Sequence, residues 1–190
     1  MRLSPRTIAF LGCCLLAVPS TFVHAQAAEK PAVGTHVSPS KTYDKLLSGM
    51  EKEFVSAAEA MPEDKFNFAP PASAGEFKGV RTFAGQVKHV AAANYYFFGG
   101  MSEKDAQAKE EAIEKLTSKA DIIKAIKDSF AVAHTYIGGI TDENVFVMTA
   151  SGTRGGMASM GISHVMDHYG QMVIYLRMNG IVPPASRGGM

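Results

Sequence analysis

The chain has 190 residues, of which 46% are hydrophobic, and its 19 Lys and Arg nearly balance its 18 Asp and Glu to give a formal net charge of +1. A near-neutral chain lacks the concentrated basic face that phosphate binding requires, which argues against nucleic acid as a partner. This length is enough for one domain with a sizeable core.

The first 25 residues have the pattern of a secretory signal peptide. Arg2 and Arg6 form a basic start, an apolar run extends from Ile8 to Val18, and Val23-His24-Ala25 offers a small-residue cleavage site. The run is too short for a permanent membrane span, and no other stretch reaches that length. We therefore expect an exported protein, periplasmic or secreted, without a membrane span.

Removal of this signal would leave a chain with different chemistry. Both cysteines, Cys13 and Cys14, lie within it, so the mature chain would have no disulfide, cysteine nucleophile or thiolate ligand. The formal charge would change from +1 to 1 − 2 = −1, because two arginines and no acids are lost.

The first half of the mature chain predicts two helices. Residues 26–39 are rich in Ala, Pro, Gly and Thr, which is typical of a flexible leader. Apolar residues then recur at helical spacing from Ser40, the predicted N-cap, until Pro62. Residues 62–79 have the composition of a long loop, and a second helix is expected from about Thr82 to Phe98, ended by Gly99-Gly100.

The second half predicts two more helices. Residues 102–119 are strongly charged, which indicates a solvated crossover that carries at most a short helix. Helical patterns follow at about 119–137 and 157–178, with a linker at 141–156 between them. With no repeat and no convincing strand, residues 40–186 are expected to form an all-α, four-helix bundle with a long crossover between helices two and three.

Three histidines form the candidate functional site. His164 and His168 are four residues apart on the last predicted helix, so their rings lie about 40° apart around the axis and one turn apart along it. His89, on the second predicted helix, has small neighbours on its stripe that leave room for an ion or ligand. Three imidazoles around one ion would leave an open coordination position.

His89 and the run from His164 to Pro184 resemble the DinB family of metal-dependent proteins, also called DinB/YfiT-like, over roughly residues 40–186. The resemblance implies a four-helix bundle with a long crossover and a three-histidine metal site at His89, His164 and His168. It also implies a divalent ion, usually zinc or nickel, and often a homodimer. Characterised relatives are transferases or isomerases that use bacterial thiols such as bacillithiol and mycothiol. The export signal is a departure, because those thiols are cytoplasmic.

Several neighbouring residues have alternative interpretations. The His-x-x-x-His pair lacks the glutamate of the zinc-protease motif, and Asp167 is about 100° away from His168 around the helix, which favours a supporting or solvated carboxylate. His134 is a rival or fourth ligand, although a structural role is favoured for it. Gln171 would either orient a bound water or substrate or pair with the backbone.

Two main functions follow from this pattern. The first is a divalent-metal-dependent hydrolase or transferase, in which free positions on the ion take water or a heteroatom of a small-molecule substrate. The alternative is a non-catalytic binding module whose ion is structural or captures a small ligand. A third, weaker possibility is a metal-free bundle that binds an apolar ligand.

Overall fold

The computed structural model describes residues 30–188. The signal-peptide prediction for residues 1–25 therefore lies outside the described residues. The helical unit begins at His36, and the described residues before it belong to a separate unit. Within the described chain no β-strand forms, and the one β-bridge joins Met148 to Thr153. The predicted all-α class is confirmed.

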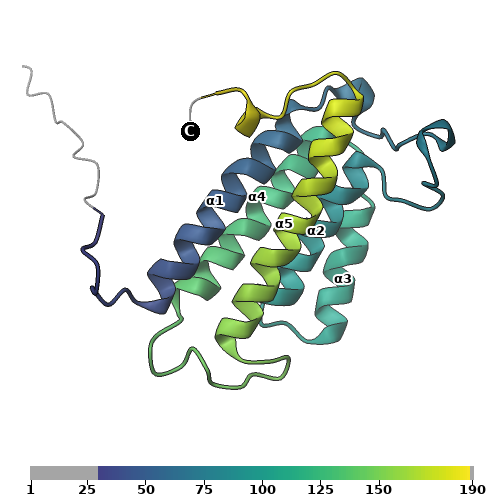
Figure 1. The fold of residues 1–190 in the computed structure, drawn as a ribbon. Helices are drawn as coiled ribbons and strands as arrows, with labels where there is room; N and C mark the ends of the chain where they lie inside the picture. Colours follow the sequence, from purple (N-terminus) through teal and green to yellow (C-terminus); the bar gives the residue numbers. More distant parts are fainter. Residues whose placement is uncertain (1–29, 189–190) are drawn as a thin grey trace, which may run out of the picture. The chain divides into compact units, whose positions relative to one another are not determined.

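Four long helices form the bundle, and a fifth lies beside it (Figure 1). Helix α1 packs against α4 and α5, and α2 packs against the same two helices, so α1 and α2 occupy opposite corners. Helix α3 connects α2 to α4 and packs on α2. The bounds are α1 Pro39–Ala60, α2 Phe83–Phe98, α3 Glu103–Glu114, α4 Lys119–Gly138 and α5 Arg154–Met178, with short 3₁₀ turns at Glu63–Lys65, Ala72–Ala74 and Pro184–Ser186.

Serine and threonine caps determine where the helices begin. The predicted cap at Ser40 is wrong: Ser38 caps α1, because Pro39 has the fixed φ that suits the first helical position. The last helix begins at Arg154 rather than near Met157, since Thr153 accepts a hydrogen bond from the Gly156 N–H at 3.1 Å. The second helix was predicted correctly, with Thr82 as its cap.

The crossover contains more helix than the sequence indicated. Ser102 caps α3 by accepting a hydrogen bond from the Asp105 N–H at 3.2 Å and donating its hydroxyl to the Asp105 carboxylate at 2.7 Å. Ile113 is the one core residue that α3 contributes. The Lys88 ammonium, from α2, lies 3.1 Å from the Glu114 carboxylate and donates to the Glu114 carbonyl. These contacts hold α3 against α2.

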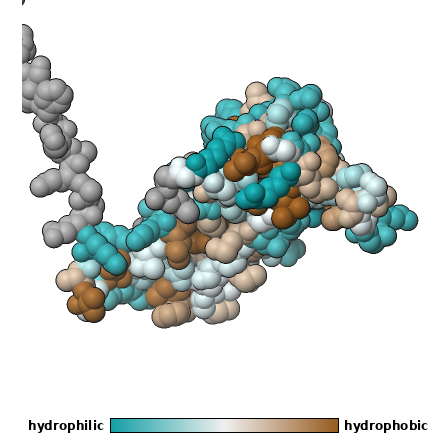
Figure 2. Space-filling model, turned by 45° about the horizontal axis from the view of Figure 1, so that its top comes forward, coloured by the Kyte–Doolittle hydropathy of each residue, from teal (hydrophilic) through white to brown (hydrophobic). Residues whose placement is uncertain are grey.

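The core fills the space between the four long helices. Phe54 of α1 and Phe130 of α4 meet edge to face with ring centroids 6.3 Å apart. A buried hydrogen bond of 3.0 Å from the Asn94 amide to the Ser129 hydroxyl joins α2 to α4. Hydrophilic and apolar residues are interspersed on the face shown in Figure 2. In the described part of the chain, every helix is too short or too polar to cross a membrane.

Candidate metal centre

The three predicted ligands come from the two helices that face each other across one side of the bundle. His89 lies near the middle of α2, and His164 and His168 lie one turn apart on α5. His168 is buried, whereas the other two rings are half-buried. The stripe of α2 that carries His89 includes Ala92 and Ala93, whose small side chains leave space beside the ring.

The three rings converge on one point. Ring centroids are 5.0 Å apart for His89 and His164, 4.7 Å for His89 and His168, and 4.5 Å for His164 and His168. One ligand nitrogen from each ring can be chosen so that no two are farther apart than 4.8 Å. Among the described residues, no other group of this kind is present. The three histidines named from the sequence therefore lie together in the fold.

The distance between one nitrogen of His89 and one of His164 suits two ligands of a shared ion. The Nε2 atoms of His89 and His164 are 3.1 Å apart. Two imidazole nitrogens each about 2.1 Å from one ion are about 3.0–3.4 Å apart when their bonds meet between a right angle and the tetrahedral angle. The pair is thus spaced as two ligands of one ion.

Burial keeps the cluster uncharged at neutral pH. Desolvation and the neighbouring imidazoles lower the pKa values of His164 and His168 to about 4. Desolvation, followed by the positive charge of Arg81, also lowers the pKa of His89. A metal ion binds the neutral imidazole, so these shifts leave the lone pairs available at neutral pH.

A chain of three hydrogen bonds orients His168. The Asp167 carboxylate accepts from the Gln171 amide at 3.2 Å, the Gln171 carbonyl accepts from the Gln86 amide at 2.8 Å, and the Gln86 carbonyl lies 2.5 Å from Nδ1 of His168. Because a carboxylate and a carbonyl only accept, Nδ1 must carry the proton. The lone pair is then on Nε2, as in histidines that bind metal through Nε2.

His164 lacks such support. Its Nδ1 atom is buried and has no hydrogen-bond partner in the described chain, which is costly for a polar atom. The ring is held by its Nε2 contact with His89 and by packing near Phe97, whose ring centroid is 5.5 Å away. The convergence of three imidazoles, with no competing partner at the buried Nδ1 of His164, is a donor set that fits a divalent metal.

The other candidate residues have different positions. His134, on α4, hydrogen-bonds Asp44 at 2.6 Å and Glu51 at 2.8 Å, so both of its ring nitrogens are engaged with α1 and it is not part of the cluster. The structural role favoured for His134 agrees with this geometry. Gln171 pairs with the Gln86 side chain rather than with the backbone, and Asp167 supports it.

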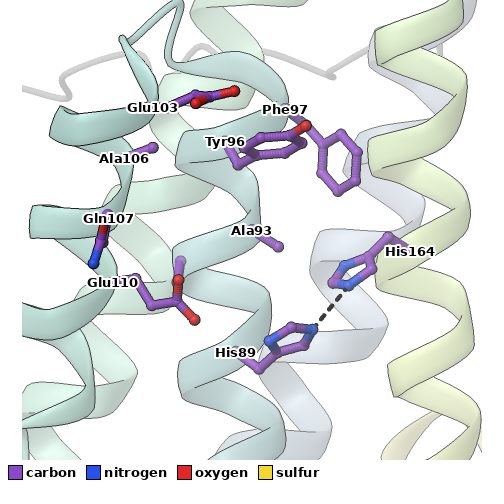
Figure 3. Close-up of a pocket in the computed structure, with 10 residues that line it drawn as sticks. His89, Ala93, Tyr96, Phe97, Glu103, Ala106, Gln107, Glu110 and His164 are labelled. Carbon is purple, nitrogen blue, oxygen red and sulfur yellow. Dashed lines mark hydrogen bonds between the residues drawn. The ribbon is translucent and has the colours of Figure 1, made fainter. Parts of the chain in front are cut away.

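A cavity of about 360 Å³ opens beside the cluster, between α2, α3 and α5 (Figure 3). His89 and His164 lie on one side of it, and residues of α3 lie on the other. Its lining is more apolar than polar, and its size suits a small organic molecule. The lining consists of His89, Ala92, Ala93, Tyr96, Phe97, Glu103, Ala106, Gln107, Glu110 and His164.

Sequence reasoning missed both Gln86 and the α3 side of this cavity. Gln86 is 2% exposed although glutamine is mostly a surface residue, and its place three residues before His89 was the available signal. The charged composition of residues 102–119 predicts that Glu103 and Glu110 belong to a solvated crossover. Their role in the lining depends on how α3 docks, which local sequence does not encode.

Comparison with known proteins places the chain in a family. The family model of the DinB superfamily matches residues 46–172, more than half of the chain, and this range includes all three histidines. No curated protein matches the sequence.

Proposed function

The chain belongs to the DinB superfamily, and we propose that it is a divalent-metal-dependent hydrolase or transferase whose ion is held by His89, His164 and His168. The observation that carries the proposal is the convergence of three neutral imidazoles beside a cavity large enough for a small-molecule substrate. A purely structural ion would need a closed set of four ligands. Here three protein ligands and an adjoining cavity favour an ion with exchangeable positions.

Each residue has a defined task in this proposal. The three imidazoles bind through their lone pairs, and Gln86 fixes the tautomer of His168. His168 is 6% exposed and absent from the cavity wall, whereas His89 and His164 line it, so the free positions would face the cavity. When bound, the ion supplies Lewis acidity that lowers the pKa of a coordinated water or thiol.

Zinc or nickel is the proposed metal, because imidazole suits both ions and the mature chain offers no thiolate. The proposal also includes export, since residues 1–25 have the pattern of a signal peptide. Export would separate the protein from cytoplasmic thiols, so a substrate other than those thiols is expected. A small molecule that fits the cavity beside His89 and His164 is the proposed substrate.

Cobalt substitution tests whether the ion is open to substrate. The mature chain, purified without a histidine tag, is loaded with Co²⁺, and its visible d–d spectrum is recorded with increasing azide. An open site predicts a saturable spectral change at one Co²⁺ per chain, because azide replaces exchangeable water. A bound Co²⁺ whose d–d spectrum does not change with azide would instead support the non-catalytic, structural alternative and contradict the enzyme proposal.

A further inference from the structure

The α3 wall of the cavity carries charge of one sign. Glu103 and Glu110 are seven residues apart, two turns of helix, and therefore lie on one face of α3. Figure 3 shows Glu103 at the Tyr96 end of the cavity and Glu110 at the His89 end. The lining contains no lysine or arginine. Within the described chain, neither carboxylate has an ion-pair partner.

Two lysines near this wall have other partners. The Lys109 ammonium lies over the ring of Tyr95, 4.6 Å from its centroid, and the Lys88 ammonium pairs with Glu114. With no lysine or arginine in its lining and no ion pair to Glu103 or Glu110 among the described residues, the α3 side of the cavity is acidic. An acidic cavity favours ligands with positive charge and raises their local concentration.

Aromatic rings complete the opposite wall. Tyr96 and Phe97 meet edge to face with ring centroids 5.3 Å apart, and both line the cavity. Tyr96 is 55% exposed, so its ring is accessible to a ligand. A carboxylate beside an accessible aromatic face is a combination that binds ammonium groups, through charge and through the ring quadrupole.

We propose that this cavity takes a small organic cation, an amine with an apolar body, and that this is the substrate class of the proposed metal centre. The ammonium group lies at the Glu103 and Tyr96 end, away from the histidines, because a divalent ion would repel it. The apolar body lies along Phe97 and the alanines, and the other end of the ligand points to His89 and His164. This assignment of a substrate rests on the proposed function, although binding of the cation does not.

Three probes with the same body and different charge test the proposal. Binding of 2-phenylethylammonium, 2-phenylethanol and 3-phenylpropanoate to the mature chain is measured by titration calorimetry, with and without one equivalent of zinc. The ammonium is expected to bind about tenfold more tightly than the alcohol, and the carboxylate most weakly. E103Q should reduce the preference for the ammonium over the alcohol about threefold, and E110Q, which removes a charge at the other end of the cavity, should reduce it less.

The matched control is E111Q, which removes the same charge from α3 outside the cavity and keeps an oxygen that can accept from Gln107. It should leave the preference unchanged. Equal affinities for the ammonium and the alcohol, or an equal loss in E111Q, would overturn the inference. Zinc uptake by the same samples separates the two proposals. If the protein binds zinc but does not prefer the ammonium, only the cation site is contradicted. If it prefers the ammonium but does not bind zinc, only the metal-dependent function is contradicted.

Discussion

The buried amide of Gln86 orients His168, one of the three candidate metal ligands. It lies between the Nδ1 atom of His168 and the carbonyl of Gln171, and it contributes a hydrogen bond to each. The carboxylate of Asp167 at the far end accepts only, so it fixes the direction of every bond in the chain. The tautomer of a buried ring is thereby set by an acid that does not touch it.

Replacement of Gln86 by Met should weaken zinc binding about 10- to 100-fold, because partners that orient a ligand have effects of this size. Met has a similar volume but cannot replace the oxygen that accepts a hydrogen bond from Nδ1–H, whereas Q86E places a carboxylate oxygen there and should lose much less affinity. The dissociation constant is measured by competition with a chelator of known affinity. An unchanged constant in Q86M would show that the hydrogen-bond chain does not position His168.

His134 should make the free energy of unfolding depend on pH. Burial alone would lower the pKa of His134, but its hydrogen bonds to Glu51 and Asp44 outweigh burial and raise it. Because the pKa is higher in the folded than in the unfolded chain, the interaction stabilises the fold fully below about pH 6.5 and is lost as the pH rises through the raised value.

The free energy of unfolding should therefore fall as the pH rises above about 6.5 in the natural chain, and H134Q should remove that slope. The change is expected to be below about 1 kcal/mol, since the carboxylates are partly exposed. Urea unfolding at several pH values in this range measures it. The cluster histidines titrate at lower pH and do not add to the slope. Parallel pH profiles for both proteins would rule out this role for His134.

At the scale of the helices, the approach of α5 to α2 depends on Gly161. A Cβ atom at this position would lie 2.3 Å from Cζ of Phe98 and 3.2 Å from Cβ of Phe97. Gly161 is one turn before His164, so this close approach sets the spacing between His164 and the α2 ligand, His89. On the same helix, Gly170 has open space around its Cα.

The variant G161A should be destabilised by about 1–3 kcal/mol through overpacking, and it should bind zinc more weakly because α5 is displaced from α2. The matched control G170A should gain up to about 1 kcal/mol, since alanine favours a helix interior and nothing blocks its methyl group. Thermal unfolding and zinc titration of both variants provide the readouts. Normal stability and affinity in G161A would contradict the role of this contact.

Local signals predicted some elements well and others poorly. The helix at 82–98 was predicted to within a residue because Thr82 and Gly99 mark its ends. The beginning of α5 was missed because Arg154 to Gly156 have little apolar character, and the Thr153 cap decides the start. Helix α3 was underestimated because it has one core residue, Ile113, so its apolar periodicity is weak. Its docking depends on contacts with α2.

In the candidate site, too, some residues could be predicted from the sequence and others could not. His164 and His168 were predictable because a four-residue spacing on one helix fixes their relation. His89 was chosen because it lies on a second helical pattern among small residues, and the family resemblance agreed with that choice. The partners of these ligands were not predictable. Gln86 meets Gln171 across two helices, and Glu110 reaches the cavity only because α3 folds back on α2. Such contacts between elements are a property of the tertiary structure.

Across the bundle, the candidate metal centre joins the corner helix α2 to its neighbour α5. Helices α1 and α4 supply no ligand, and they hold the other two in place through the shared core. Binding of an ion to the folded state alone should therefore stabilise the complete bundle. One metal at 100 times its dissociation constant would add about 2.7 kcal/mol to the free energy of unfolding.

The metal stoichiometry of the untagged chain, without its predicted signal peptide, tests whether His89, His164 and His168 together bind one ion. Elemental analysis and zinc and nickel titration are applied to the natural sequence, to H89A, H164A and H168A, and to H36A, whose exposed histidine lies outside the cluster. Circular dichroism first confirms that each variant is folded. The account predicts one ion per chain in the natural protein and in H36A, and loss of stoichiometric binding in each cluster variant. Stoichiometric binding retained in all three cluster variants would contradict it.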